Sequence, residues 1–268
     1  MSKKPLVSIL IASYNKENFV SRCIESCLFQ SYKNIEIIFF DDGSTDNSYQ
    51  IAKKYKKIKV IKNKKKNKNS KFNTYSQLNS YMQAYKKSNG EIISFLDSDD
   101  YYKKNKIKEV VKYFKNNSNS MVVFDKPIHI FPNNKKVYPF KNINHKLKKY
   151  IWPKFPPQSC ISIKKKFFKN YILEIINKNY SMLTLDFRIS VLSSIISKDF
   201  FIINKNLTYY YQDIYGETLS KFKKFGVNWW LRREQAHNYV RYISKKHKIR
   251  YKINFDYIIT SLLVKVIK

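Results

Sequence analysis

The chain has 268 residues, 43% of them hydrophobic and 16% aromatic, so it can bury a sizeable core and is not globally disordered. Its formal net charge is +34, but only six of its 53 basic residues are arginine, a lysine bias typical of codon drift in an AT-rich genome. Specific nucleic-acid binding is not expected, because it usually draws on arginine forks, whereas attraction to an anionic membrane or glycan stays open.

The first half of the chain alternates between short apolar strands and amphipathic helices. Runs rich in β-branched and aromatic residues predict strands over residues 6–11, 35–40, 58–61 and 91–96. Apolar residues at helical spacing predict helices over residues 19–28, 51–55, 75–87 and 107–114. This order predicts an α/β fold with a Rossmann-like, mostly parallel sheet flanked by helices. The lysine-rich stretch Lys62–Lys71 is expected to be a solvated loop.

The pattern weakens beyond residue 120. Short strands are predicted at residues 121–124, 201–203 and 208–211, and a helix at residues 189–196. The proline-rich stretch Trp152–Pro157 predicts an irregular loop. Residues 221–268 carry 13 basic and two acidic residues, and they predict a C-terminal helical extension that is basic and aromatic.

An acidic cluster, Asp97-Ser98-Asp99-Asp100, directly follows the predicted strand at residues 91–96. Three carboxylates in four residues repel one another at the end of a buried strand. A divalent cation relieves that repulsion, because Mg²⁺ and Mn²⁺ prefer carboxylate and phosphate oxygens. The alternative is a cap for the following helix, which would need only one Asp.

Two further polar clusters follow the first and second predicted strands, namely Ser13-Tyr14-Asn15 and Asp41-Asp42-Gly43-Ser44. A tyrosine at the mouth of a sheet can stack on a base, and a nearby carboxylate can accept a hydrogen bond from that base. The alternative is a turn and a helix cap. Ligands of open parallel sheets bind beyond the carboxyl ends of the strands, and all three polar clusters are expected at that edge.

Together these motifs resemble those of the family 2 glycosyltransferases, which have the GT-A fold. The matching stretch runs from Val7–Asn15 through Ile35–Ser48 to Gly90–Asp100, close over residues 1–115 and looser to residue 220. The resemblance implies an inverting transferase. It would move a sugar from a nucleoside-diphosphate sugar, most often a UDP-sugar, to a hydroxyl of a glycan or lipid-linked acceptor in surface polysaccharide, capsule or lipooligosaccharide synthesis.

The resemblance also implies roles for single residues. The nucleotide-sugar site would comprise Ala12, Ser13, Tyr14, Asp42, Asp97 and Ser98. In it Tyr14 would stack on the base, Asp42 would bond to the base, and Asp97 would lie near the ribose. Asp99 would ligate a divalent metal, Mn²⁺ or Mg²⁺, that bridges the diphosphate, and Asp100 would support the site or contact the acceptor.

The family's catalytic base is an acidic residue that opens a later helix, and Asp186 matches that place. The usual Glu-Asp pair is Leu185-Asp186 here, and a structural Asp at a helix start is the alternative. Two other positions depart from the family: Tyr81-Met82 replaces an Arg-Asn pair, and Gln212–Tyr215 lacks a common His. The charge that faces the diphosphate is expected from Arg188 or from a lysine of the loop Lys62–Lys71.

The resemblance predicts a catalytic domain over residues 1–220, with a nucleotide-sugar-binding half (1–115) and an acceptor half (116–220), followed by the extension 221–268. A sugar site could be formed by the aromatic residues of the segment Trp152–Ser159 and of the pair Trp229-Trp230. The alternative is that these residues pack in the core. The basic tail could lie on anionic lipid.

Neither a signal-peptide pattern nor an apolar run of about 18 residues is found, which predicts a cytoplasmic protein, peripheral on the inner face of the membrane. Two other functions stay open: a degenerate homologue that binds the donor without turnover, and a basic protein that binds nucleic acid or membrane. A nucleotidyltransferase is disfavoured, since no glycine-rich loop follows the first strand.

Overall fold

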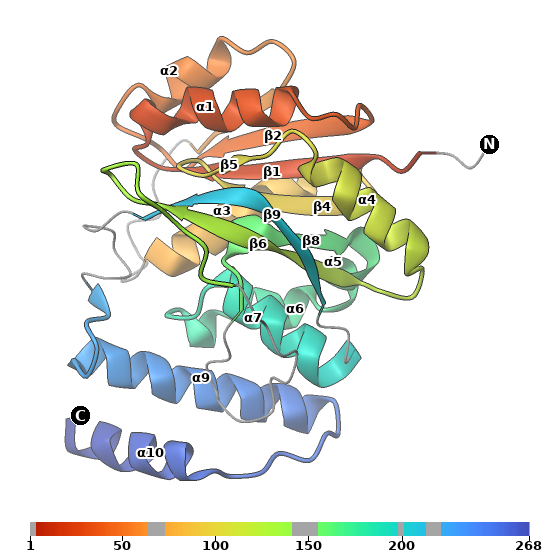
Figure 1. Cartoon of the computed structure of the whole chain (residues 1–268). Coiled ribbons are helices and arrows are strands. Elements are labelled where there is room, and N and C mark those ends of the chain that lie inside the picture. Colours follow the sequence, from red (N-terminus) through yellow and green to blue (C-terminus); the bar gives the residue numbers. More distant parts are fainter. Residues whose placement is uncertain (1–3, 64–72, 141–154, 198–200, 213–220, 268) are drawn as a thin grey trace.

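One mixed sheet organises the chain. The structure, a computed structural model, describes residues 4–63, 73–140, 155–197, 201–212 and 221–267 (Figure 1). Within them nine strands pair in the order β3-β2-β1-β4-β8-β6-β9-β5, and β7 pairs with β6. The strands are β1 (Val7–Ser13), β2 (Ile35–Asp41), β3 (Lys59–Lys62), β4 (Ile92–Asp97), β5 (Tyr101–Tyr102), β6 (Val122–Ile130), β7 (Lys136–Val137), β8 (Ile161–Lys164) and β9 (Ile202–Tyr211).

Helices cover both faces of this sheet. The α-helices are α1 (Glu17–Leu28), α2 (Ser48–Lys53), α3 (Asn73–Lys86), α4 (Lys106–Asn116), α5 (Lys165–Asn170), α6 (Ile172–Ile175), α7 (Leu185–Leu192), α9 (Val227–Lys246) and α10 (Phe255–Ile267). Two 3₁₀ turns, η1 (Gln158–Cys160) and η2 (Lys178–Tyr180), and a π-helical turn, η3 (Ser193–Ser197), complete the described elements. None of the described helices is both long and apolar enough to cross a membrane.

Six described strands, β1 to β4, β6 and β9, run in one direction. Strand β8 is antiparallel to both of its neighbours, β4 and β6. The mostly parallel α/β sheet predicted from the sequence is therefore confirmed. In its centre Ala12 of β1 lies in register with Phe40 of β2 and with Asp97 of β4, so the carboxyl ends of the three strands meet at one edge.

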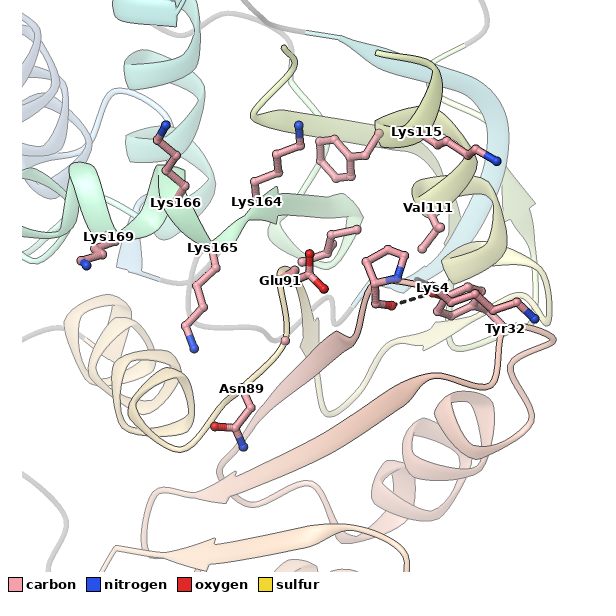
Figure 2. Close-up of a pocket in the computed structure, with 14 residues that line it drawn as sticks. Lys4, Tyr32, Asn89, Glu91, Val111, Lys115, Lys164, Lys165, Lys166 and Lys169 are labelled. Atoms are coloured by element: carbon pink, nitrogen blue, oxygen red, sulfur yellow. Dashed lines mark hydrogen bonds between the residues drawn. The ribbon is translucent and has the colours of Figure 1, made fainter. Parts of the chain in front are cut away.

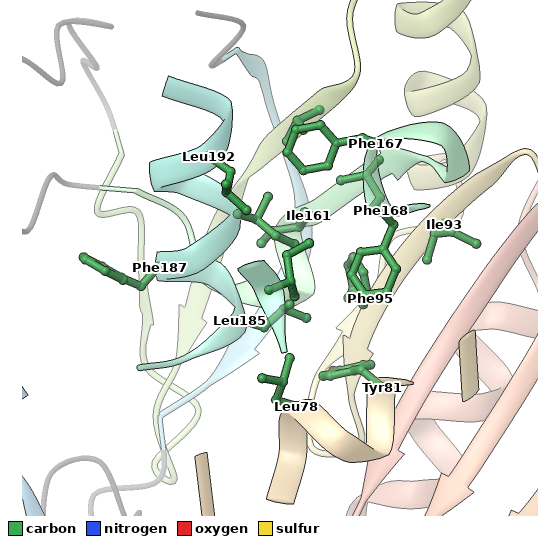
Figure 3. Packing of buried hydrophobic residues seen from close by; sticks show 14 of the residues in the cluster. Leu78, Tyr81, Ile93, Phe95, Ile161, Phe167, Phe168, Leu185, Phe187 and Leu192 are labelled. Carbon is green, nitrogen blue, oxygen red and sulfur yellow. The ribbon is translucent and has the colours of Figure 1, made fainter. Parts of the chain in front are cut away.

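The alternation of side chains along β1 divides the core into two layers. Val7, Ile9 and Ile11 face a cluster formed with α1 and α4, whereas Leu10 and Ala12 face a cluster formed with α3, α5, α7 and α9. Figure 3 shows the second cluster, in which Leu78 and Tyr81 of α3 and Leu185 and Leu192 of α7 approach the phenylalanines at positions 95, 167 and 168. This packing places α3 and α7 beside the carboxyl edge of the sheet.

The second half differs from the sequence expectation in its strands. The two short strands predicted at residues 201–203 and 208–211 are one strand, β9, and the strand predicted at 121–124 continues to Ile130 as β6. β9 pairs in parallel with β6 along its whole length, and the register shifts between Asp125 and Pro127. That irregularity lets the polar residues 204–206 remain within the strand.

Candidate functional site

The loops that follow β1 and β2 are joined by hydrogen bonds. The amide of Asn15 donates to Ser44 Oγ (3.0 Å), and Asn15 Oδ1 accepts from the amide of Thr45 (2.9 Å). The amide of Lys16 donates to Ser48 Oγ (2.8 Å). Asn15 has a φ of 51°, a left-handed conformation that Asn tolerates better than most residues. The two polar motifs found in the sequence therefore form one unit at the carboxyl edge of the sheet.

The residues expected to bind the nucleoside lie around this unit. Ala12 and Ser13 are buried at the end of β1, and Tyr14 is half-buried just beyond them. Asp42 is buried as well; its Oδ1 accepts from Asn63 Nδ2 (3.0 Å), and its Oδ2 accepts from the hydroxyl of Ser76. The carboxylate of Asp42 is therefore held in place from two sides.

Asp97 is surrounded by hydrogen-bond donors. Its Oδ1 accepts from Gln77 Nε2 (2.7 Å), from the Tyr81 hydroxyl (2.6 Å) and from Gln158 Nε2 (2.8 Å). Burial raises the pKa of Asp97 to about 7, the charge of Asp99 adds to this, and the bonds from Tyr81 and Gln158 oppose it. Tyr81, which departs from the family pattern, therefore contributes directly to the site.

Asp100 and Ser98 are buried behind this carboxylate. Both oxygens of Asp100 are occupied: Oδ2 accepts from Ser159 Oγ (2.5 Å), and Oδ1 accepts from the amide of Tyr211 (2.8 Å). Burial raises the pKa of Asp100, and the charges of Asp99 and Asp97 raise it further. The amide of Ser98 donates to the carbonyl of Ala12 (3.2 Å) and ties the acidic loop to β1. Asp100 supports the loop from inside the protein.

Asp99, like Asp97, is partly exposed, whereas Asp100 is buried. Oδ2 of Asp99 lies 2.8 Å from Nζ of Lys16, and both side chains are partly exposed. The three aspartates can each direct one oxygen to a common point, with these oxygens all within 4.8 Å of one another. Because Asp97 and Asp100 are held by internal donors, Asp99 is the carboxylate best placed to take a divalent cation. The donor set, oxygen only, fits Mg²⁺ or Mn²⁺.

Asp186 opens α7 and faces the same acidic cluster. Its Oδ1 accepts from the amide of Phe187 (2.7 Å). Burial raises its pKa, whereas hydrogen bonds from Thr184 and Phe187 and the positive charge of Arg232 in α9 lower it. The charge of Asp186 also contributes to the raised pKa of Asp97, so the two carboxylates are electrostatic neighbours.

Tyr210 of β9 lies among all four carboxylates. Burial raises the pKa of its hydroxyl, and the charges of Asp100, Asp97, Asp186 and Asp99 raise it further, in that order. The end of β9 is also joined to the acidic loop by the hydrogen bond from the amide of Tyr211 to Asp100 (2.8 Å). A polar region bounded by carboxylates on two sides is a place where a hydroxyl can be bound and deprotonated.

Arg188 does not face this region, which corrects the expectation that it could supply charge to the diphosphate. Its side chain is buried, and its guanidinium donates to four carbonyls: those of Leu183 (3.1 Å), Ile175 (2.6 Å), Asn177 (3.0 Å) and Tyr180 (2.5 Å). Arg188 therefore fixes the loop before α7. The other predicted source of charge, Lys62–Lys71, lies mainly in residues 64–72, outside the described residues.

The burial of Arg188 predicts a large effect on stability. We expect Arg188→Met to lower the free energy of unfolding by about 3 kcal/mol, because it leaves buried carbonyls without donors. The exposed Arg250 offers a matched control, and Arg250→Met is expected to change stability by no more than about 0.5 kcal/mol. Urea denaturation of the three proteins measures the difference. Equal midpoints for Arg188→Met and wild type would contradict this role.

Several residues of the site were not identified from the sequence. They are Lys16, Gln77, Gln158, Ser159, Tyr210 and Arg232. Lys16 directly follows the motif Ser13–Asn15, so its position was a usable signal. Gln158 and Ser159 lie at the end of the proline-rich segment that was considered as a sugar site; residues 152–154 of that segment lie outside the described residues. Trp229 and Trp230 are half-buried and pack edge to face on each other.

A separate lysine-rich pocket of about 1010 Å³ lies at the opposite, amino-terminal edge of β1 and β4 (Figure 2). Its lining includes six lysines and one acidic residue, Glu91. Lys165 Nζ donates to the carbonyl of Ser88 (2.7 Å), and Lys164 Nζ donates to that of Ser118. Lys164 and Lys165 therefore hold neighbouring backbone segments in place. The pocket lies away from the acidic cluster and is no part of the candidate site.

The chain is similar in sequence to known glycosyltransferases. A family model for glycosyl transferase family 2 matches residues 8–172. The UDP-Glc:alpha-D-GlcNAc-diphosphoundecaprenol beta-1,3-glucosyltransferase WfaP of Escherichia coli is 38% identical over 108 residues, which are 40% of this chain and 41% of that protein. The putative teichuronic acid biosynthesis glycosyltransferase TuaG of Bacillus subtilis is 33% identical over 110 residues, 41% of this chain and 42% of TuaG. The chain thus spans about two fifths of these relatives.

Solved structures extend the similarity of the fold. S. aureus TarS 1-349 in complex with UDP-GlcNAc superposes with a TM-score of 0.64 at 19% sequence identity, covering 87% of this chain and 66% of TarS. The complex of the same protein with UDP gives a TM-score of 0.62 at 18% identity. The family model covers more than half of the chain, and the sheet with its acidic loop agrees with it. The chain therefore belongs to glycosyl transferase family 2 and has the GT-A fold.

Proposed function

We propose that the chain is an inverting glycosyltransferase that moves a sugar from a UDP-sugar to a hydroxyl of a glycan or lipid-linked acceptor in cell-surface polysaccharide synthesis. The observation that carries the proposal is the cluster of Asp97, Asp99 and Asp100 at the carboxyl edge of the sheet, with the charge of Asp186 near enough to raise the pKa of Asp97. TarS forms complexes with UDP and with UDP-GlcNAc, and WfaP is named a UDP-Glc:alpha-D-GlcNAc-diphosphoundecaprenol glucosyltransferase. These relatives support the donor class and the acceptor class.

The nucleoside of the donor is bound by the residues after β1, β2 and β4. Tyr14 stacks on the base, and Asp42, fixed by Asn63 and Ser76, accepts a hydrogen bond from the base. Ala12, Ser13 and Ser98 form the backbone floor beneath the nucleotide, and Asp97 contacts the ribose. Residues 1–115 form the donor half, residues 116–220 form the acceptor half, and residues 221–268 form an extension. Arg232 of this extension places a positive charge near Asp186.

Asp99 would be the protein ligand of a divalent metal, Mn²⁺ or Mg²⁺, beside the diphosphate. When bound, the metal acts as a Lewis acid that neutralises the charge on the leaving nucleoside diphosphate. Lys16, which pairs with Asp99, supplies a second positive charge beside the phosphates. Asp100 keeps the acidic loop in place through Ser159 and Tyr211.

The acceptor hydroxyl is activated from the other side of the sugar. Asp186 accepts its proton as general base while the hydroxyl oxygen attacks the anomeric carbon. The bond to the leaving phosphate breaks on the opposite face, so one displacement inverts the anomeric configuration. The positive charge of Arg232 favours the ionised form of Asp186.

Thermal unfolding tests the donor site. We expect UDP with Mn²⁺ to stabilise the protein by about 2.7 kcal/mol at a hundredfold excess over its Kd, and GDP, CDP and dTDP to stabilise it less. Turnover of UDP-sugars then tests the transfer. Stabilisation without turnover of any UDP-sugar would identify a donor-binding homologue, and no stabilisation by any nucleotide would refute the proposed donor site.

An acceptor linked to a lipid would place the enzyme at the cytoplasmic face of the inner membrane. The strong positive charge of residues 221–268 supports this location, because anionic headgroups attract clusters of lysine and arginine.

A further inference from the structure

Helix α10 carries its large apolar side chains on its outer surface. Six of them, between 36% and 86% exposed, form what we name the α10 stripe: Phe255, Ile258, Ile259, Leu262, Leu263 and Val266. Figure 1 shows α10 as the outermost layer, outside α9 and remote from the sheet. The spacing of three and four residues keeps these side chains on one side of the helix.

The opposite side of α10 is fixed to α9 by polar contacts. Asp256 accepts from Arg233 Nε (2.9 Å) and pairs with Nε2 of His237 (3.0 Å), and Arg241 donates to the hydroxyl of Tyr257 (2.5 Å). Thr260 is buried at the same interface. A surface helix of a water-soluble protein usually turns its large apolar side chains inward. Here the inward side holds Asp256, Tyr257, Thr260 and one buried apolar residue, Val264, and hydrogen bonds to α9 fix it there. The outward direction of the α10 stripe is therefore built into the fold.

Exposed cations lie near the amino-terminal end of α10. Lys245, Lys248, Arg250 and Lys252, at the end of α9 and in the connection to α10, are all exposed. Lys248, Arg250 and Lys252 make no ion pair with any residue that the structure describes. An apolar stripe beside unpaired cations matches an interface in which acyl chains lie beneath anionic headgroups.

We propose that the α10 stripe inserts into the surface of an anionic lipid bilayer and that the neighbouring cations bind its headgroups. Thirteen residues are too few to cross a bilayer, so α10 lies in the interface plane. A second copy of the chain is the less suitable occupant, because each copy carries a formal charge of +34 and two copies repel. The inference rests on the proposed membrane location and names the helix that makes the contact.

Vesicle sedimentation of the full chain tests the inference. Wild-type protein is expected to bind vesicles of phosphatidylglycerol and phosphatidylcholine strongly and pure phosphatidylcholine vesicles weakly. Ile258→Ser/Leu262→Ser should lower the partition coefficient about tenfold or more, because two apolar side chains would no longer be buried in the bilayer. Lys248→Gln/Arg250→Gln/Lys252→Gln should lower binding to the anionic vesicles by a similar factor, since each cation contributes near the surface.

A control double variant separates the stripe from general surface hydrophobicity. Phe29→Ser/Leu173→Ser removes two exposed apolar side chains elsewhere and should bind vesicles as wild type does. Equal sedimentation of the stripe variant and wild type, or no preference for anionic vesicles, would overturn the inference. So would wild-type dimers in lipid-free buffer that the stripe variant converts to monomers.

The melting shift with UDP and Mn²⁺ is measured on the same proteins. If the protein does not bind vesicles but UDP still raises its melting temperature, only the membrane contact is refuted. If it binds vesicles but UDP does not raise its melting temperature, only the donor site is refuted.

Discussion

Asp99→Asn is expected to lower transfer about 100- to 1,000-fold and to abolish the stabilisation by UDP that depends on Mn²⁺. Asp97 and Asp100 are held by internal donors, so neither can replace Asp99 without breaking its own hydrogen bonds. Steady-state kinetics with the active UDP-sugar measure the first effect, and melting with and without Mn²⁺ measures the second.

The same substitution should leave the metal-free protein at least as stable as wild type. The charge of Asp99 raises the pKa of both Asp97 and Asp100, so ionisation of the cluster at neutral pH costs folding free energy. Removing that charge relieves the repulsion, and the exposed ion pair that is lost with Lys16 contributes little. A loss of activity through unfolding is thereby separated from a loss of the metal ligand.

Glu109 offers a matched control. It pairs with Lys205 at 2.8 Å, the same distance as Asp99 to Lys16, and its side chain is 17% exposed against 20% for Asp99. Glu109→Gln is expected to keep wild-type transfer and the shift that depends on Mn²⁺. If Asp99→Asn keeps that shift as well, Asp99 is not the metal ligand.

The sequence predicts those site residues that directly follow the neighbouring strands β1, β2 and β4. Parallel strands bring their carboxyl ends to one edge, so a motif after β1 and a motif after β4 must meet, and Ala12 is indeed in register with Asp97. The same logic placed Asp42. These positions follow from local patterns and a general rule of sheet topology.

Two partners of Asp97 come from a segment that no local pattern connects to it. Gln158 and Ser159 reach the acidic loop because β8 inserts, antiparallel, between β4 and β6. The positions of Arg188 and Arg232 could not be predicted from the sequence for a similar reason. Helix α7 is buried almost all round, so its pattern does not indicate the direction of Arg188, whereas Arg232 approaches Asp186 only through the packing of α9.

Asp186→Asn is expected to lower kcat about 100- to 10,000-fold while the stabilisation by UDP and Mn²⁺ is retained, because the general base is lost and the donor site is not. The alternative role, a structural residue at the start of α7, predicts a different result. Asn keeps a side-chain oxygen that can accept from the amide of Phe187, so a purely structural role would leave kcat near wild type.

The pH dependence of turnover gives the same test in the wild-type enzyme. Only ionised Asp186 can accept a proton, and burial raises its pKa, so kcat is expected to rise with pH along a limb above the usual Asp range. In Asp186→Asn this limb should disappear from the residual rate. A limb that persists unchanged would assign the base to another group.

The stability of Asp186→Asn completes the argument, because the sign of its change follows from the same pKa. The folded state holds the proton of Asp186 more tightly than the unfolded state, so its contribution to stability falls as pH rises from the ordinary Asp pKa through the raised value. At neutral pH the ionised carboxylate therefore costs folding free energy, and Asn removes that cost. We expect Asp186→Asn to unfold at the same or a higher urea concentration than wild type at pH 7 while it loses turnover. A variant that loses both stability and turnover would point to a structural role for Asp186. A stable, inactive variant that still binds UDP would identify Asp186 as the catalytic base, whose ionised form costs folding free energy but is needed for the reaction.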